Sequence, residues 1–368
     1  MYISFDDGKN WQSFQLNLPI VPITDLAVKE NDLVVGTQGR SFWIMDDLTP
    51  LHQLSDKIAK SESHLYKPRD TYRLPGGGAS GGPSPTWGKN PPNGVMTVYY
   101  LDEEVGEDDE FSLEFMEPNG EVIKTYTHKK DKNKPGPVAA VKKGMNRFVW
   151  NMRYPDAKKV HGAVMWGGSH IGPKAVPGDY KVRMNVNGKS QTQSFKILKD
   201  PRINTTQSDF NDQFDLLMDI RNRTTEINEK ILTIRSIKKQ VNTLTGLMKD
   251  SGFKNDQLTD AGKALVKSLT GIEEELIQVK SKSGQDPLNY PIKLDNKIAA
   301  LVRVVSSVDA RPTAQSYDVL NDLVDRAEVH YKKLDKVLTD DLFKFNNMVS
   351  DVGVPAVMVI PSEMSVER

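Results

Sequence analysis

Apolar and polar residues alternate in short runs over the first fifty residues, which is the pattern of β-strands with one buried face. Five runs follow this pattern: MYISFD, NWQSFQL, ITDLAVKEN, DLVVGTQG and SFWIMDDL. The first two flank Asp6-Asp7-Gly8, and an Asp-Gly pair between alternating runs predicts a tight hairpin. Because a lone hairpin cannot bury one face, we expect it to continue a larger β structure. We therefore predict a β domain over residues 1–54.

The alternation stops over residues 55–94. HLYKPRDTYRL is predicted to be a short extended connector, and the tract PGGGASGGPSPTWGKNPPNG has no means of packing a core. We therefore predict a connector followed by an exposed Gly/Pro-rich linker.

Strand-like runs resume over residues 95–200. EPNGEV and NVNGKS place Asn-Gly between alternating runs, which predicts two hairpins. Short strands at this regular spacing predict a fibronectin III-like β-sandwich, with Phe148 and Trp150 in its core. A Gly-rich insertion, DAKKVHGAVMWGGSHIGPKAVPGDY, interrupts these strands.

From residue 205 the apolar residues recur every three or four positions, which predicts amphipathic helices. Thr206 or Ser208 can cap the first of them. Breaks at DSGFKNDQ, SGQDPLNYP and DARPT leave four helices, and short turns predict an antiparallel bundle over 205–350. The apolar tail, residues 351–368, is expected to lie back on a neighbouring domain. The apolar positions of the four helices span residues 210–248, 265–279, 294–305 and 317–342.

The composition excludes several classes of protein. The 368 residues are 38% hydrophobic and 27% charged, which is typical of a folded chain, and together with the patterns above this predicts a multidomain α+β protein. Lys plus Arg and Asp plus Glu are 49 each, so no general attraction to nucleic acid or anionic membrane is expected. The absence of cysteine excludes disulfides and thiolate metal sites.

The sequence shows neither a membrane-spanning run nor a leader. No apolar run approaches the roughly 18–20 residues that span a bilayer. No signal peptide follows Met1, because residues 2–11 are already strand-like and polar. Two alternatives remain open: the chain is cytoplasmic, or its natural N-terminus is missing.

The opening hairpin carries a spaced motif. Ser4, Asp6, Gly8 and Trp11 fit the pattern Ser-x-Asp-x-Gly-x-x-Trp. Asp6 can accept hydrogen bonds from the amides of the turn, Gly8 allows a positive φ, and Trp11 can bury a large ring against a neighbouring sheet. This pattern resembles the Asp-box, or bacterial neuraminidase (BNR) repeat, of sialidases and of the sortilin propeller.

The resemblance extends along nearly the whole chain. ITDLAVKENDLVVGTQGRSFWIMDDL looks like the closing blade of such a propeller, and GMNRFVWNMRYP, AVPGDYKVRM and KDPRIN look like the segments that follow it. PLNYPIKLDNKIAAL and DARPT look like the C-terminal region of the same proteins, which are often labelled glycosyl hydrolases and occur notably in Bacteroidetes. The resemblance implies that residues 1–54 are a β-propeller remnant at the end of a longer protein. It also implies a periplasmic, outer-membrane-associated or secreted location.

Catalysis is not expected within this chain. Sialidase chemistry needs an arginine cluster together with a nucleophile and its acidic partner, and only Arg40 falls in the blade-like region. Trp43 is predicted to lie in the blade core, with the channel of an intact propeller as the alternative. GGGASGG lacks the Lys-Ser/Thr of a phosphate-binding loop, and KKDKNKPGP lacks the interleaved aromatic residues of a nucleic-acid site.

Other candidate residues lie in loops. The acidic run at residues 102–110 is predicted to be a solvated loop, with a calcium site as the alternative. His161 and His170 are predicted to lie in a surface loop, with a transition-metal pair as the alternative. Trp166 is expected to cover the edge of the sandwich, and the alternative is stacking on a sugar or a partner. No metal site and no cofactor are predicted.

Three hypotheses for function follow. The favoured one is a non-catalytic binding and scaffold region of a sortilin-like cell-envelope protein, with a protein or glycan partner, or the rest of the propeller, meeting Arg40, Trp43, His161, Trp166 and His170. The second is that these are accessory domains of a BNR-repeat glycoside hydrolase. The third is a chain that completes its blade by pairing with another chain, because an unfinished sheet pairs readily at its edge. The third hypothesis implies an oligomer.

Overall fold

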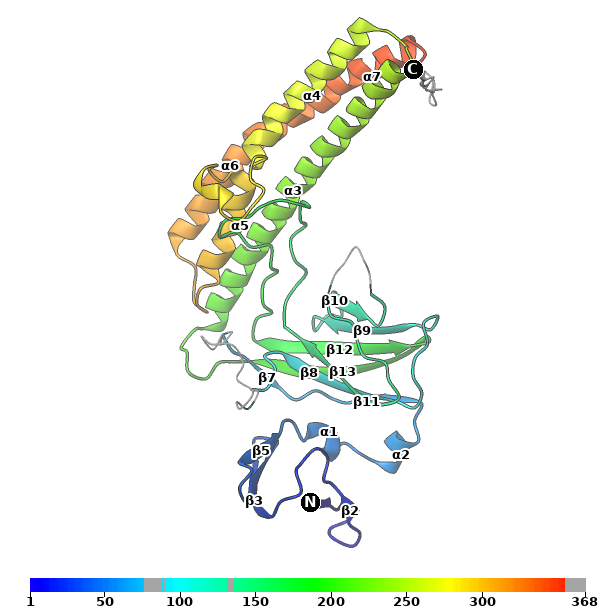
Figure 1. The fold of residues 1–368 in the computed structure, drawn as a ribbon. Coiled ribbons are helices and arrows are strands. Elements are labelled where there is room, and N and C mark those ends of the chain that lie inside the picture. Colours follow the sequence, from blue (N-terminus) through cyan, green and yellow to red (C-terminus); the bar gives the residue numbers. More distant parts are fainter. Residues whose placement is uncertain (76–87, 89, 131–135, 355–368) are drawn as a thin grey trace. The chain divides into compact units, whose positions relative to one another are not determined.

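The computed structural model describes residues 1–75, 88, 90–130 and 136–354. The described chain divides into two compact units. Met1–Arg153 and Ala175–Ile203 form the first, called here the strand unit, and Tyr154–Lys174 joins the residues from Asn204 onward in the second, called the helical unit. Several sheets and a C-terminal helical region make the protein mixed α+β, as predicted (Figure 1). The predicted boundaries at residues 54, 94, 200 and 350 stay predictions.

The strand pattern of the first fifty residues is confirmed. Two short strands pair antiparallel in the opening hairpin, and three longer ones form an antiparallel sheet in the order β3-β4-β5. Two one-turn helices follow, which the sequence analysis did not predict. These elements are β1 (Tyr2–Ile3), β2 (Gln12–Ser13), β3 (Ile23–Lys29), β4 (Asp32–Thr37), β5 (Phe42–Met45), α1 (Thr49–His52) and α2 (Asp56–Ala59).

Two larger sheets complete the strand unit, in the orders β10-β9-β12-β13-β7 and β11-β8-β6. All neighbouring strands in them are antiparallel except β13 and β7, which are parallel. Their bounds are β6 (Ser63–Leu65), β7 (Thr71–Arg73), β8 (Val95–Leu101), β9 (Phe111–Met116), β10 (Val122–Thr127), β11 (Gly144–Trp150), β12 (Gly178–Val186) and β13 (Lys189–Lys199).

The two predicted Asn-Gly hairpins are confirmed. Val186 pairs with Lys189 across the turn between β12 and β13, and the intervening Asn187 and Gly188 have φ values of 46° and 79°. Two consecutive positive φ values match the right-handed twist of the strands, and Asn and Gly adopt them readily. The EPNGEV turn joins β9 to β10, where a bulge follows Val122.

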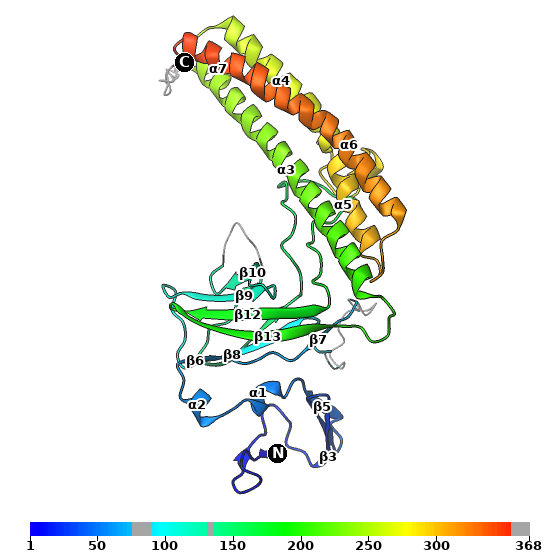
Figure 2. The same cartoon turned by 180° about the vertical axis from the view of Figure 1, so that it is seen from behind.

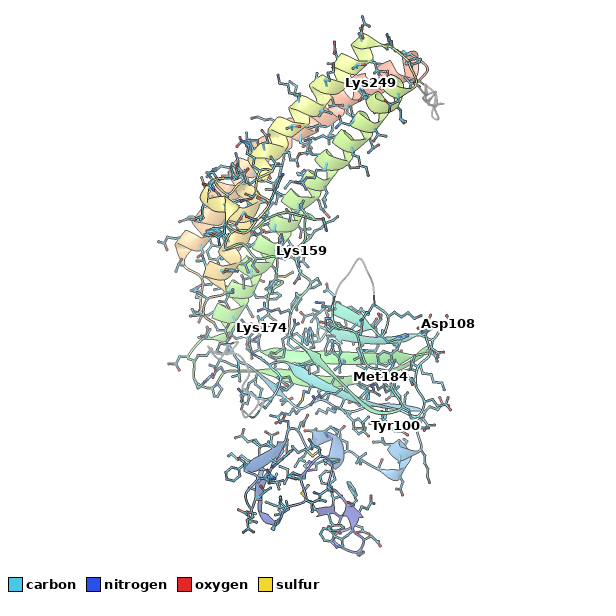
Figure 3. The ribbon with its side chains drawn as sticks, in the orientation of Figure 1. Tyr100, Asp108, Lys159, Lys174, Met184 and Lys249 are labelled. Atoms are coloured by element: carbon cyan, nitrogen blue, oxygen red, sulfur yellow. The ribbon has the colours of Figure 1, made fainter. Side chains whose placement is uncertain are left out.

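Aromatic side chains fill the core of the strand unit. Trp150 of β11 is fully buried and stacks on Phe115 of β9, with 4.7 Å between ring centroids. Met184 on β12 is also buried, whereas Tyr100 on β8 is half-buried (Figure 3). The prediction that Phe148 and Trp150 lie in the core is confirmed.

The helical pattern is largely confirmed. The helices are α3 (Gln207–Asp250), α4 (Asp256–Leu276), α5 (Leu294–Val305), α6 (Ala314–Lys336) and α7 (Leu342–Asp351), and a π-helical turn at Val337–Asp341 joins the last two. Figures 1 and 2 show α3 beside α5 and α4 beside α6. None of the helices among the described residues is long and apolar enough to cross a membrane.

The helix ends follow local chemistry. Thr206 caps α3 in a capping box, because its hydroxyl accepts from the Asp209 amide at 3.2 Å and the Asp209 carboxylate accepts from the Thr206 amide at 3.1 Å. Asn255 caps α4, which therefore starts nine residues before the predicted position at Leu265. The expectation that α4 reaches Val279 is wrong, because the chain turns extended at Ile277.

The insertion at residues 154–174 belongs to the helical unit. Arg221 of α3 donates to the carbonyl of Pro155 at 3.0 Å, and Asn228 of α3 donates to that of Lys158 at 2.6 Å. The ring of Tyr154 meets Phe214 edge to face, with centroids 4.8 Å apart. The insertion is therefore a structured strap on α3 and not a loose loop between strands.

Candidate functional site

The opening turn has the hydrogen bonds that the Ser-x-Asp-x-Gly-x-x-Trp spacing predicts. Ser4 Oγ donates to Asp6 Oδ1 at 2.9 Å and accepts from the Gly8 amide at 2.8 Å. Asp6 Oδ1 accepts from the Asn10 amide at 2.8 Å, and Trp11 Nε1 donates to the Gly8 carbonyl at 3.0 Å. Gly8 has a φ of 85°, which favours glycine. The backbone of Asn10 contributes most to lowering the pKa of Asp6, so the turn holds this carboxylate ionised.

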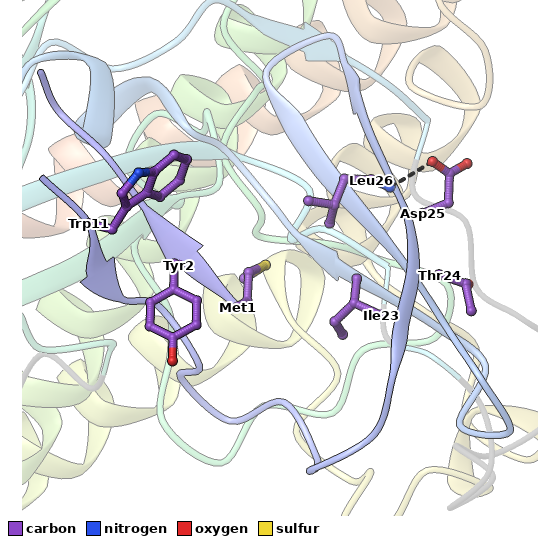
Figure 4. Close-up of a pocket in the computed structure, with 7 residues that line it drawn as sticks. All are labelled: Met1, Tyr2, Trp11, Ile23, Thr24, Asp25 and Leu26. Carbon is purple, nitrogen blue, oxygen red and sulfur yellow. Dashed lines mark hydrogen bonds between the residues drawn. The ribbon is translucent and has the colours of Figure 1, made fainter. Parts of the chain in front are cut away.

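Trp11 is not buried, which corrects the expectation that it packs against a neighbouring sheet. Its side chain is 62% exposed. With Met1, Tyr2, Ile23 and Leu26 it lines an open cavity of about 830 Å³ (Figure 4). The walls of this cavity are mostly apolar, and the Asp25 carboxylate on its rim accepts from the Leu26 amide at 2.8 Å.

The neighbouring sheet exposes apolar side chains at both of its edges. β4 is the central strand, so β3 and β5 have no outer partner among the described residues. Leu26 and Val28 on β3 are more than half exposed, as are Phe42 and Ile44 on β5, and Phe42 reaches 75%. Edge strands in soluble proteins usually carry charges or prolines that prevent pairing. The β5 edge carries no charge or proline, whereas β3 carries the exposed charges Asp25 and Lys29 beside its apolar residues, so β5 is the edge better suited to contact with further protein.

Arg40 and Trp43 lie in and beside the turn that leads into β5. Trp43 is half-buried and donates from Nε1 to the Arg40 carbonyl at 3.1 Å, while Arg40 is exposed. Trp43, Leu33 and Val35 line a smaller cavity of about 300 Å³. Arg40 makes no ion pair among the described residues.

His161, Trp166 and His170 lie on the strap, but they do not converge. His161 is exposed, whereas His170 is half-buried with Nε2 3.4 Å from Asn228 Nδ2. Burial, aided by Lys159, lowers the pKa of His170, so the ring is neutral at pH 7. No group of three or more His, Asp or Glu side chains in the described part of the chain is placed to hold a metal ion.

Trp166 is anchored by α5. Its amide donates to Asn296 Oδ1 at 2.7 Å, and Asn296 Nδ2 donates to its carbonyl at 2.9 Å. A Cβ on Gly168 would lie 3.0 Å from Asn296 Nδ2, so a larger residue there would need this side chain to shift slightly. The backbone of Trp166 is therefore fixed within the helical unit, and the expectation that its ring covers an edge of a sandwich stays a prediction. Its side chain is 44% exposed on this fixed backbone.

Several polar residues with clear roles escaped the sequence analysis. Asn228 and Asn296 hold the strap, and both occupy buried positions in helices. Glu273 of α4, also buried, accepts from Arg235 at 2.6 Å and from Lys238 at 2.8 Å. Burial alone would raise the pKa of Glu273, but these two hydrogen bonds lower it. The sequence signal that could have identified Asn228 and Glu273 is a polar residue at a position where the helical spacing predicts a buried apolar one.

Some predictions concern other segments. The acidic run at 102–110 is mostly exposed, and Asp109 accepts from the Gly106 amide at 2.8 Å, as expected of a solvated loop (Asp108 is labelled in Figure 3). The Gly-rich stretch at 76–82, residues 131–135 of the basic run and residues 355–368 of the predicted tail lie outside the described residues.

Comparisons with known proteins assign no family to this chain. No family model matches the chain, and no curated protein matches it significantly. A solved structure named pT26-6p aligns with 70% of this chain at 12% identity, with a TM-score of 0.13. The aligned part spans 46% of that protein, less than half of its length. The resemblance to sortilin-like and BNR-repeat proteins stays a prediction.

Proposed function

We propose that this chain is a non-catalytic binding and scaffold region of a sortilin-like propeller protein of the cell envelope or exterior. In this proposal residues 1–54 form part of a propeller blade. Residues 95–200 form a fibronectin III-like sandwich, and residues 205–350 form an antiparallel four-helix bundle. The N-terminal sheet is the binding element, and the rest of the chain supports or docks it.

The observation that carries the proposal is the exposed apolar surface on the two edge strands of the β3-β4-β5 sheet, of which β5 has no charged residue and β3 also carries Asp25 and Lys29. Phe42, Ile44, Leu26 and Val28 leave large apolar surfaces in water. Burying such surface is worth about 25 cal/mol per Å². An edge strand also presents unpaired backbone amides and carbonyls, which another strand can satisfy. The fitting partner is therefore further β structure, either another blade of the same protein or a strand of a different one.

The alternative is an accessory region of a BNR-repeat glycoside hydrolase. The turn at Ser4, Asp6, Gly8 and Trp11 supports it equally, because the resemblance links this pattern to sialidases as well as to sortilin. A panel of glycosides incubated with the full chain tests this alternative, which gains support if sugar is released.

Binding can be tested with arrays of extended peptides and of glycans, probed with the full chain. The double variant Phe42→Ser/Ile44→Ser removes the apolar side chains from one edge, and Phe343→Ser, which removes a similarly exposed aromatic ring from α7, is the matched control on another surface. We expect retention of peptides rich in alternating apolar residues, loss in the double variant and no change in the control. Peptide binding that survives the double variant, or binding to glycans alone, would contradict a role for this edge.

The oligomeric state tests whether a second copy of this chain is the partner. Light scattering after size exclusion reports the mass of the chain in solution. If the edges pair with a second copy, the wild type forms dimers and the double variant forms monomers. A monodisperse wild-type monomer would rule out self-pairing and leave a different β partner as the proposed occupant.

A further inference from the structure

A second cavity lies in the helical unit, where the start of α5 faces α6 and the end of α4. Its volume is about 450 Å³, within the range of small-molecule sites. Figures 1 and 2 show α5 and α6 next to each other along this part of the unit. Four basic residues line the cavity, together with one carboxylate and several apolar side chains. The basic residues are Lys293, Lys297, Arg326 and His330, and the carboxylate is Glu275.

Helix geometry explains why the basic residues converge. Lys293 and Lys297 are four residues apart at the start of α5, and Arg326 and His330 are four apart on α6. Residues at this spacing lie on the same face of a helix. Two facing helices thus contribute one basic pair each, and Val329 of α6 adds an apolar side chain to the lining.

The charges in the cavity are not balanced. Lys293 lies 3.4 Å from Glu275, and Arg326 pairs at 3.4 Å with Asp322 on its own helix, where both side chains are more than half exposed. Lys297 is half-buried and makes no ion pair among the described residues. An anionic ligand would supply the counter-charge that Lys297 lacks among the described residues.

The N-terminus of α5 adds to the positive potential in the cavity. Lys293 is at the N-cap position and provides no side-chain cap for the first amides of the helix. The N-terminus of a helix carries a partial positive charge that favours anions. Burial lowers the pKa of His330. The nearby charges of Lys333 and Lys293 lower it further, and Glu275 opposes them.

We propose that this cavity binds a small phosphate-bearing ligand. Arg326 provides a planar fork for two phosphate oxygens, Lys297 provides the uncompensated charge, and neutral His330 can donate one hydrogen bond. The available volume accommodates a phosphate group with a small organic substituent. Nothing in this proposal depends on the N-terminal sheet, so it can fail or succeed independently of the proposed function.

The test is calorimetric titration of the full chain with pyrophosphate and with inorganic phosphate, at constant ionic strength set with sodium chloride. Lys297→Gln/Arg326→Gln removes two charges from the cavity. Lys239→Gln removes a charge from an exposed position on α3 and is the control. Each lost charged hydrogen bond is expected to weaken binding about tenfold or more, whereas the control should bind as the wild type does. Circular dichroism checks that each variant is folded.

A second readout localises the ligand. The Cε1–H resonance of His330, assigned with His330→Gln, reports its titration by proton NMR. A bound dianion stabilises the imidazolium, so pyrophosphate should raise the pKa of His330. The proposal is overturned if pyrophosphate gives no heat above that of chloride, if the double variant binds as tightly as the wild type, or if the His330 titration does not move.

Phosphate groups also occur on lipids, and one further arm distinguishes this source. Vesicles of phosphatidylcholine, with or without phosphatidic acid, are sedimented with the wild type and the double variant. Binding only to the phosphatidic acid vesicles, lost in the double variant, assigns the site to a lipid phosphate. Binding to soluble phosphates without sedimentation assigns it to a free metabolite.

Discussion

The N-terminal sheet and the helical unit carry equally regular apolar patterns, but they use them differently. In the helical unit the apolar stripe of α3 is buried, with Ile220, Ile227 and Ile231 fully hidden from water. In the β3-β4-β5 sheet Val35 is buried, whereas Phe42 and Val28 are mostly exposed. An apolar periodicity therefore predicts which face of a helix or strand is apolar. It does not predict whether other residues of the same chain bury that face.

The largest expected effect comes from breaking the buried stripe. Ile234→Ala removes three carbons from a fully buried position on α3 and should lower the free energy of unfolding by about 2–5 kcal/mol. Urea unfolding followed by circular dichroism at 222 nm measures this, because the helices dominate that signal. A loss below about 1 kcal/mol would show that the helical core is looser than the burial of Ile234 indicates.

Burial in the helical unit extends to a carboxyl group, which gives the second prediction. Burial raises the pKa of Asp295 from its ordinary value of 3.8 to about 7, while the Asn296 amide and Arg235 oppose this rise. The free energy of unfolding should therefore fall as pH rises from about 4 to about 7 and stay low above that range.

Asp295→Asn should remove this pH dependence. The variant should gain up to about 4 kcal/mol over the wild type at pH 8 and little at pH 4, since one pKa unit is worth about 1.4 kcal/mol. Urea unfolding at both pH values provides the measurement. An equal effect at both values would show that the substitution acts through packing and not through charge.

The cap of α3 gives a smaller effect. Thr206→Ala removes the capping box and should cost about 1 kcal/mol. Ser208→Ala changes the other residue that the sequence offers as a cap, and it should cost less than about 0.5 kcal/mol because Ser208 is exposed. Thermal unfolding of the two variants decides between the two caps, and a larger loss for Ser208→Ala would contradict the observed hydrogen bonds.

The smallest effect is expected at the exposed edge. Phe42→Ser should change the free energy of unfolding by less than about 0.5 kcal/mol, because its side chain is already in water. A small change for Phe42→Ser together with a large loss of stability for Ile234→Ala would show that the apolar residues of the sheet edge, unlike those of α3, do not stabilise the isolated chain. If Phe42→Ser destabilised the isolated chain strongly, the edge would be covered in solution, and a self-association measurement would follow.

Much of the local structure could be predicted from the sequence. The Asn-Gly turns, the Thr206 cap and the bounds of α5 follow from interactions within a few residues, which a pattern records directly. The start of α4 was missed because Asn255 caps a first turn whose apolar residues are sparse.

Long-range pairings could not be predicted. The hydrogen bonds between Trp166 and Asn296 join residues 130 positions apart, and no local pattern specifies them. The lysines and Arg326 of the second cavity come together only once α5 faces α6. The open cavity at Trp11 was missed for the opposite reason, because the sequence motif predicted a buried ring.

The path of the chain between its two units has a practical consequence. The polypeptide crosses between them three times, after Arg153, after Lys174 and after Ile203. A cut after Ile203 separates the helices from the strand unit, but the fragment that begins at Asn204 lacks the strap partners of Asn228 and Asn296. A single cut therefore cannot release the helices together with their strap and without strands of the other unit, and expressing them as a complete module requires joining residues 154–174 to the fragment that begins at Asn204.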